Sequence, residues 1–226
     1  MSVLVLAAHP DDEVLGCGGT IARLTAAGTG VAIAILGEGV TSRYAARGDA
    51  DTNQLAALQG NSRRAADILG VSKLFTFGLP DNRFDSIPLL DVVKVIEKLI
   101  ADLRPEVVYT QHGGDLNIDH AVLFRATLTA TRPMAETPVR AVYAYEVASS
   151  SEWAFGQFAP RFLPNLFVNI EATLETKVAA MQVYESEARL FPHPRSPDAL
   201  LAQARRWGAT VGVAAAEAFQ VVREIR

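Results

Sequence analysis

The chain has 226 residues, of which 50% are apolar and 20% are charged, and its formal net charge at pH 7 is −4. This composition is typical of a globular protein that can bury a full core without disulfides or structural metals. The small negative charge and the lack of a Lys/Arg run give no reason to expect nucleic acid as a partner. The single cysteine, Cys17, excludes an intramolecular disulfide and suits a reducing cytoplasm.

Membrane insertion and secretion are not expected either. No stretch of the sequence approaches the roughly 20 apolar residues of a membrane span. The apolar N-terminal stretch is too short for a signal peptide and has no basic lead. We therefore expect a cytoplasmic protein.

Apolar periodicity predicts strands that alternate with helices along the chain. Strands are expected at 3–8, 31–36, 73–78, 106–110, 141–145 and 166–169, with 219–225 as a closing strand or an extended tail. Helices are expected at 14–27, 55–69, 89–103, 119–131, 171–184 and about 200–212. This alternation is typical of an α/β fold with a mostly parallel sheet covered by helices on both faces. Since no repeat or linker interrupts the pattern, we expect one domain over residues 1–226.

Polar loops follow the first four predicted strands. In open parallel sheets, ligands bind outside the carboxyl ends of the strands, so these loops should converge on one crevice. The loop at 37–53 is long and rich in Gly, Ser, Thr, Arg and Asp. Long loops within compact domains are usually functional or mobile.

The first strand is followed by a stretch that contains an imidazole and three carboxylates. His9 and Asp12 are three residues apart across a strand-to-helix turn, close enough to bind one metal ion together. A catalytic zinc ion takes three protein ligands and leaves one position for water, and His120 is the best candidate for the third ligand. Asp11 must point differently from Asp12 and could accept a proton from the water. Asp119 could lie behind the ligands and fix an imidazole.

The four histidines of the chain support this interpretation to different degrees. A lone histidine is more often a satisfied or surface imidazole than a metal ligand. However, His9, His112 and His120 all lie at strand-end loops beside carboxylates, whereas His193 lies in a proline-rich connection. This clustering favours metal binding by His9 and His120.

A second interpretation needs no metal. Asp11 and Asp12 could cap the helix that follows them, and Asp119 could cap the helix at 119–131, because carboxylates suit helix N-termini. The protein would then be a noncatalytic glycan- or nucleotide-binding domain. Gly16, Gly18 and Gly19 fall inside the helical pattern, and neither GxGxxG nor a P-loop lysine is present, so no nucleotide cofactor is expected. Close helix–sheet packing is the better explanation of these glycines.

Two motifs resemble those of a known family. Ala8-His9-Pro10-Asp11-Asp12-Glu13, followed by Gly16-x-Gly18-Gly19-Thr20, is similar to the signature of the LmbE/PIG-L family of metal-dependent N-deacetylases. The segment Gly113-Gly114-Asp115-Leu116-Asn117-Ile118-Asp119-His120 resembles the second motif of that family. Weaker similarities lie at Tyr145-Glu146-Val147, Ser149-Ser150, Lys177, Tyr184-Glu185-Ser186 and Pro192–Ser196.

The resemblance implies a Rossmann-like fold and one catalytic Zn²⁺, with Fe²⁺ as a physiological substitute. It implies hydrolysis of an acetamido group on an amino sugar or sugar conjugate, which releases acetate and a free amine. His9, Asp12 and His120 match the metal ligands of the family, and Asp11 matches its general base.

One position departs from the family pattern. Many members have a histidine three positions before the last ligand, and this chain has Asn117 there. An asparagine amide can stabilise an oxyanion, an interaction worth roughly 3–4 kcal/mol in other hydrolases, but it cannot donate a proton at neutral pH. The proton must then come from Asp11, His112 or His193. We favour Asp11 as the shuttle and His193 as an electrostatic helper.

Substrate contacts are expected from loop residues. Arg43, Asp81, Asp85 and Arg195 are placed to reach hydroxyls or an anionic aglycone, although each could also be an ordinary surface residue. The two arginines could bind a phosphate or carboxylate if they meet. The expected partner is a small N-acetylated amino sugar or conjugate, and alanine-rich helical surface suggests a homo-oligomer. A metal-dependent amidase acting on a non-sugar acyl conjugate is the main enzymatic alternative.

Overall fold

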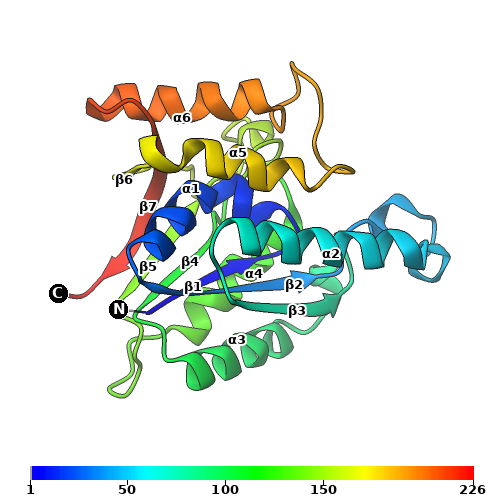
Figure 1. Ribbon diagram of the computed structural model, residues 1–226. Helices are drawn as coiled ribbons and strands as arrows, with labels where there is room; N and C mark the ends of the chain where they lie inside the picture. The colour runs from blue at the N-terminus through cyan, green and yellow to red at the C-terminus, as the bar shows by residue number, and fades with distance from the viewer. Residues whose placement is uncertain (1) are drawn as a thin grey trace.

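The computed structural model describes residues 2–226 and contains one seven-stranded sheet (Figure 1). The strand order is β3-β2-β1-β4-β5-β7-β6. The strands are β1 (Ser2–Ala7), β2 (Gly30–Gly37), β3 (Lys73–Leu79), β4 (Val107–Gln111), β5 (Ala141–Tyr145), β6 (Leu166–Asn169) and β7 (Ala216–Glu224). The helices are α1 (Asp12–Ala26), α2 (Thr52–Ile68), α3 (Leu89–Leu103), α4 (Ile118–Ala130), α5 (Leu174–Gln182) and α6 (Pro197–Val211). The predicted α/β fold class is therefore confirmed.

The order of the strands determines where a ligand can bind. Strands β1 to β5 pair in parallel, whereas β7 runs antiparallel to both β5 and β6. The chain builds the sheet outward from β1 through β2 to β3, and then returns to place β4 on the other side of β1. In such sheets the crevice lies at this reversal, outside the carboxyl ends of the two central strands. The motif after β1 and the motif after β4 are thereby brought side by side.

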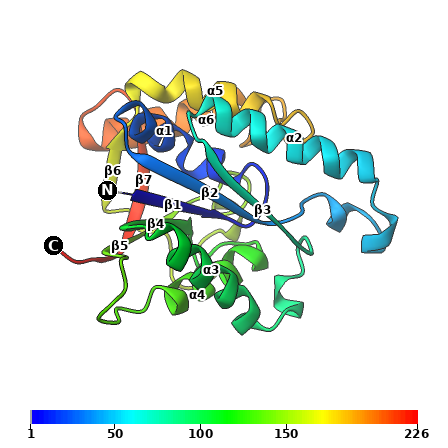
Figure 2. The same ribbon diagram turned by 60° about the horizontal axis from the view of Figure 1, so that its bottom comes forward.

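Helices cover both faces of the sheet. Helices α1, α2, α5 and α6 lie on one face, and α3 and α4 lie on the other (Figures 1 and 2). Alternate residues of β1 enter two separate apolar clusters, with Val3 and Val5 in one and Leu4 and Leu6 in the other. Burial on both faces is why this strand is an unbroken apolar run rather than an alternating one.

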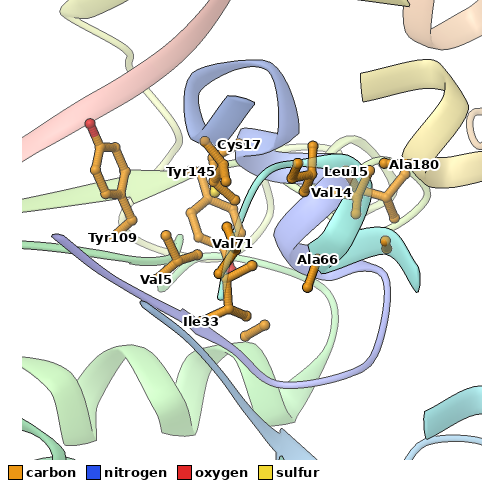
Figure 3. Close-up of a cluster of buried hydrophobic side chains, with 14 of the residues drawn as sticks. Val5, Val14, Leu15, Cys17, Ile33, Ala66, Val71, Tyr109, Tyr145 and Ala180 are labelled. Atoms are coloured by element: carbon orange, nitrogen blue, oxygen red, sulfur yellow. The ribbon is translucent and has the colours of Figure 1, made fainter. Parts of the chain in front are cut away.

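The first of these clusters lies under α1. Val5 and Ile33 of the sheet and Leu15 of α1 belong to it, and Tyr145 enters it from β5 (Figure 3). The Tyr145 hydroxyl donates a hydrogen bond to the Leu6 carbonyl (2.7 Å), so the ring is fixed beneath α1. This packing sets how closely α1 can approach the sheet.

The glycines of the first motif allow that close approach. A Cβ atom on Gly16 would lie 2.0 Å from the Tyr145 ring, and one on Gly19 would lie 2.8 Å from Ile170. The backbone of α1 also leaves helical geometry at Cys17, where φ is −144°. The glycines therefore serve helix packing, as the sequence predicts, and Cys17 is fully buried.

A buried ion pair provides hydrogen bonds to the backbone groups of α1 that lose their helical partners at this break. Lys177 of α5 donates to the Leu15 carbonyl (2.8 Å) and to Glu217 of β7 (2.6 Å). The Glu217 carboxylate in turn accepts the backbone N–H groups of Gly19 (2.9 Å) and Thr20 (2.7 Å). Unpaired backbone groups are costly when buried, so the pair stabilises the irregular helix behind the first motif.

Several element boundaries differ from the prediction. The helix predicted at 171–184 begins with a separate 3₁₀ turn, Glu171–Thr173, and its α-helical part ends at Gln182. The closing segment is a strand of nine residues inside the sheet rather than a tail. Within residues 2–226, no helix combines the length and the apolarity needed to cross a membrane.

Candidate active site

Three predicted metal ligands meet at the carboxyl ends of β1 and β4. His9 and Asp12 follow β1, and His120 lies in the first turn of α4. The Asp12 Oδ2 atom lies 3.4 Å from Nδ1 of His9 and 3.3 Å from Nε2 of His120. One ligand atom from each residue falls within a cluster no wider than 4.8 Å. The parallel pairing of β1 with β4 creates this proximity between residues more than 100 positions apart.

The far side of each imidazole is held by a carboxylate. Nε2 of His9 lies 2.9 Å from Asp119 and 3.2 Å from Asp81. Nδ1 of His120 lies 3.1 Å from Asp115. Metal-binding histidines commonly direct their second ring nitrogen at a carboxylate, which fixes the ring and its tautomer.

Asp115 is an outer partner that the sequence analysis did not assign. It is held by the hydroxyl groups of Ser150 and Ser151, which follow β5. Its position in the Gly113–His120 motif could have indicated a role in the site. Its contacts with His120 and with a loop 35 residues away, however, form only in the folded chain.

These residues fit a divalent metal ion. His120 is only 1% exposed, and among residues 2–226 neither of its ring nitrogens makes a well-oriented hydrogen bond. Burial lowers the pKa of His120, but Asp12 and Asp115 outweigh that effect and raise it to about 9. Surroundings that stabilise positive charge on an imidazole also favour a bound cation. Two imidazoles and one carboxylate are a donor set that catalytic zinc uses.

Asp11 is turned away from the ligand cluster. Its backbone has a φ of 107°, a region that costs a non-glycine residue of order 1–3 kcal/mol. Its buried carboxylate accepts a hydrogen bond from Nη1 of Arg195 (2.7 Å). Burial raises the pKa of Asp11, the Arg195 guanidinium opposes this, and the pKa remains well above its usual value. A buried carboxylate with a raised pKa on a cavity wall is a typical candidate for a general base.

The three aspartates lie at helix N-termini, but none of them makes the side-chain hydrogen bond of a helix cap. Asp11 occupies the N-cap position of α1 but makes no side-chain cap hydrogen bond. The Asp12 carboxylate accepts from the backbone N–H of His9 (2.8 Å) and from Nε2 of Gln111 (2.9 Å). The Asp119 carboxylate accepts hydrogen bonds from the backbone N–H groups of Asn82 and Phe84 in the loop after β3, and not from its own helix.

Asn117 is the residue that caps α4. Its Oδ1 accepts the backbone N–H of Asp119 (2.9 Å), and its own N–H donates to Asp115 (2.9 Å). With Oδ1 used by the helix, the side chain has its Nδ2 group left to offer. Asn117 also lines the cavity beside the ligand cluster.

That cavity has a volume of about 130 Å³ and brings together most of the predicted substrate-binding residues. Its lining includes His9 and Asp11 from the first motif, Arg43 from the loop after β2, Asp81 from the loop after β3, and Arg195. Asp81 accepts two hydrogen bonds from Ser42 (3.1 and 2.6 Å). The crevice expected from the sheet topology is therefore present.

Apart from the ligands and Asp119, which binds His9, three predicted residues lie outside the lining of this cavity. Asp85 is exposed on the 3₁₀ turn Phe84–Ser86. His112 is buried, and its Nε2 lies 2.7 Å from the Pro160 carbonyl oxygen. His193 packs edge-on against Trp153, with ring centroids 5.5 Å apart. Neither histidine is thus placed to deliver a proton within the cavity.

Glu187 joins the two arginines and was missed by the sequence analysis. It accepts hydrogen bonds from Arg43 (2.6 and 2.7 Å) and from Arg195 (3.2 Å). The arginines do meet, but on a carboxylate of the protein itself. Glu187 directly follows the motif-like Tyr184-Glu185-Ser186, but only the folded loop shows where its side chain points.

Comparison with known proteins agrees with this geometry. The family described as PIG-L, GlcNAc-PI de-N-acetylase, matches residues 4–131, more than half of the chain. An uncharacterized deacetylase of Escherichia coli K12, YaiS, is 27% identical over 190 residues, which cover 81% of this chain and 90% of that protein. The diacetylchitobiose deacetylase of Thermococcus kodakarensis is 28% identical over 204 residues, which cover 82% of this chain and 69% of the relative.

A solved structure extends the similarity over the whole fold. The conserved protein TT1542 from Thermus thermophilus superposes with a TM-score of 0.76 at 26% identity, over 99% of this chain and 96% of that one. The matched family residues include both motifs that form the ligand cluster. The chain therefore belongs to the GlcNAc-PI de-N-acetylase family and is an enzyme of the N-deacetylase class.

Proposed function

We propose that this protein is a metal-dependent hydrolase that removes the N-acetyl group of an amino sugar or sugar conjugate, releasing acetate and a free amine. One observation supports this most directly. The cluster of His9, Asp12 and His120 adjoins a cavity whose wall carries Asp11, a buried carboxylate outside the cluster. A ligand set beside a separate base is the arrangement that amide hydrolysis requires.

His9, Asp12 and His120 would hold the ion, with Zn²⁺ as the proposed metal and Fe²⁺ as its substitute. When bound, such an ion acidifies a water molecule and polarises the amide carbonyl. Asp81, Asp115 and Asp119 would support the ligands through the imidazoles, as their distances to His9 and His120 indicate.

The protein's own groups would carry the proton and stabilise the charge. Asp11 accepts a proton as the water oxygen bonds to the acetamido carbon, and the carbonyl oxygen takes up negative charge. The Nδ2 group of Asn117 donates a hydrogen bond to that oxygen, a contribution of roughly 3–4 kcal/mol in comparable hydrolases. Asp11 then delivers its proton to the sugar nitrogen as the C–N bond breaks, which leaves acetate and the amine. Arg195 holds the Asp11 carboxylate through both transfers.

The charges around the cavity favour a neutral sugar over an anionic one. Glu187 accepts hydrogen bonds from both Arg43 and Arg195, so neither guanidinium is a free anion-binding group. We propose that Arg43 and Asp81 contact sugar hydroxyls. A second cavity of about 290 Å³ shares Val40 and Leu58 with the first and would receive the aglycone.

Acetate release measured together with metal content tests the proposal. Purified protein should carry about one metal ion per chain and release acetate from an N-acetylated amino sugar. Asp11→Asn should retain the metal and lose about 10²–10⁴-fold of the turnover. Asp85→Asn is the matched control, because Asp85 is exposed and lies outside the cavity lining. Activity of Asp11→Asn at the parent rate would contradict the assignment of the base.

A protein that stays metal-free after gentle purification with added zinc, and whose stability is unchanged in chelator, would favour a binding protein instead. Acetate release from non-sugar acyl conjugates but not from acetamido sugars would keep the mechanism and change the substrate class.

A further inference from the structure

Glu13 is a buried carboxylate that the proposed reaction does not use. Its side chain is 1% exposed, and no Lys, Arg or His among residues 2–226 pairs with it. It instead accepts two hydrogen bonds, from the backbone N–H of Asp11 to Oε2 (3.1 Å) and from the Tyr184 hydroxyl to Oε1 (2.6 Å). A buried carboxylate without a cation is costly, so these two hydrogen bonds must offset that cost.

The bond to Asp11 acts on a backbone that is otherwise unfavourable. Asp11 has a φ of 107°, which side chains with a Cβ atom rarely adopt. That conformation is what sends two consecutive side chains in different directions. The Asp12 side chain points toward His9 and His120, and the Asp11 side chain points toward the cavity and Arg195. A more ordinary φ would rotate the Asp11 carboxylate away from its place.

Two separate contacts therefore fix Asp11. Arg195 binds the carboxylate from the cavity side, and Glu13 binds the backbone N–H from the core side. Tyr184, fully buried between α5 and the site, fixes Glu13 in turn. The contact from Tyr184 spans 171 positions of sequence, so it links the end of α5 to the first motif.

We infer that Glu13 is a positioning residue for the proposed general base: its carboxylate, anchored by Tyr184, holds the Asp11 backbone in the left-handed conformation that aims the Asp11 side chain into the cavity. The inference rests on the proposed role of Asp11. It predicts that Glu13 affects turnover only through Asp11.

Steady-state kinetics of three variants test the inference. Glu13→Ala removes the acceptor and should lower kcat roughly ten- to a hundredfold, the range expected for a misplaced catalytic group, while KM and metal content stay near the parent values. Glu13→Gln keeps an oxygen for the Asp11 N–H and an amide that can bond to Tyr184, and it should retain most of the activity. Tyr184→Phe removes only the anchoring hydroxyl and should lower kcat by a smaller factor. If Glu13→Ala does not fold, the inference stands or falls on Tyr184→Phe and Glu13→Gln.

A double-mutant cycle separates this inference from the proposed function. In an Asp11→Asn background, Glu13→Ala should cause no further loss of kcat, because the group that it positions is gone. An equal loss in both backgrounds would show that Glu13 acts elsewhere and would overturn the inference. A parent-like Asp11→Asn would instead overturn the role of Asp11 itself. Metal loss or raised KM in Glu13→Ala, without a fall in kcat at saturating metal, would also refute positioning.

Discussion

Replacing Lys177 by methionine is expected to destabilise the fold strongly. The side chain is 5% exposed, and its ammonium group bonds to the Leu15 carbonyl and to Glu217. Lys177→Met leaves a carbonyl unpaired at the α1 break and removes the cation from a buried carboxylate. Breaking a buried pair from one side costs about 3–5 kcal/mol. For a chain of this length, that corresponds to a fall in Tm of about 6–20 °C.

Urea unfolding followed by circular dichroism measures this loss. Lys98→Met is the matched control, because Lys98 and Asp102 form an exposed i,i+4 pair with side chains 77% and 57% exposed. Breaking that pair should change the free energy of unfolding by about 0.5 kcal/mol or less. If Lys177→Met cost no more than the control, the argument that the pair stabilises the broken helix would be wrong. In Lys177→Met/Glu217→Gln, partial recovery is expected because the uncompensated charge is removed.

Three further predictions concern single residues. Asn117→Asp keeps an oxygen to cap α4 but loses the amide donor, so kcat should fall about 10²–10³-fold with little loss of stability. Asn117→Ala should also lose about 1 kcal/mol of the free energy of unfolding, because it removes the cap. Equal kcat for Asn117→Asp and the parent would exclude the oxyanion role. Gly16→Ala should lower the free energy of unfolding by about 1–3 kcal/mol or more, because the new Cβ atom would overlap the Tyr145 ring. An unchanged Tm in thermal unfolding would contradict this packing argument. Burial raises the pKa of Glu146 although Trp207 and Gln203 donate to it, so its contribution to stability is present below its ordinary pKa of 4.5 and is lost as the pH rises through the raised pKa. Glu146→Gln should therefore become more stable relative to the parent as the pH rises above 4.5. Parallel stability curves for the two proteins would refute this.

The local pattern of the sequence determined the fold class and the approximate position of each element. Buried strands such as β1 are short runs of Val and Leu, and the helices carry apolar residues at helical spacing, so both can be recognised over a few neighbouring residues. The polar side chains at strand ends could also be recognised, because parallel strands direct their carboxyl ends to one edge of the sheet. His9, Asp12 and His120 could thus be proposed as a cluster before any contact was known.

Tertiary structure alone decided how the charged residues divide their tasks. Asp11 and Asp12 are adjacent and chemically identical, and the φ of Asp11 separates them. Glu13 had no role in the sequence analysis, because its partner Tyr184 comes from a distant part of the chain. These contacts depend on how α1 and α5 pack together, which no local pattern encodes.

The same reason explains which predicted residues fall outside the cavity and which one was missed. Asp85, His112 and His193 have suitable chemistry, but loop geometry directs them to solvent, to Pro160 and to Trp153. Glu187 is a single acidic residue in a proline-rich connection, and folding places it between two arginines. By itself the sequence determined which loops border the crevice, because parallel strands direct their carboxyl ends to one edge of the sheet. Only the packed loops decided which side chains enter it, because that depends on long-range contacts and on backbone angles at single residues.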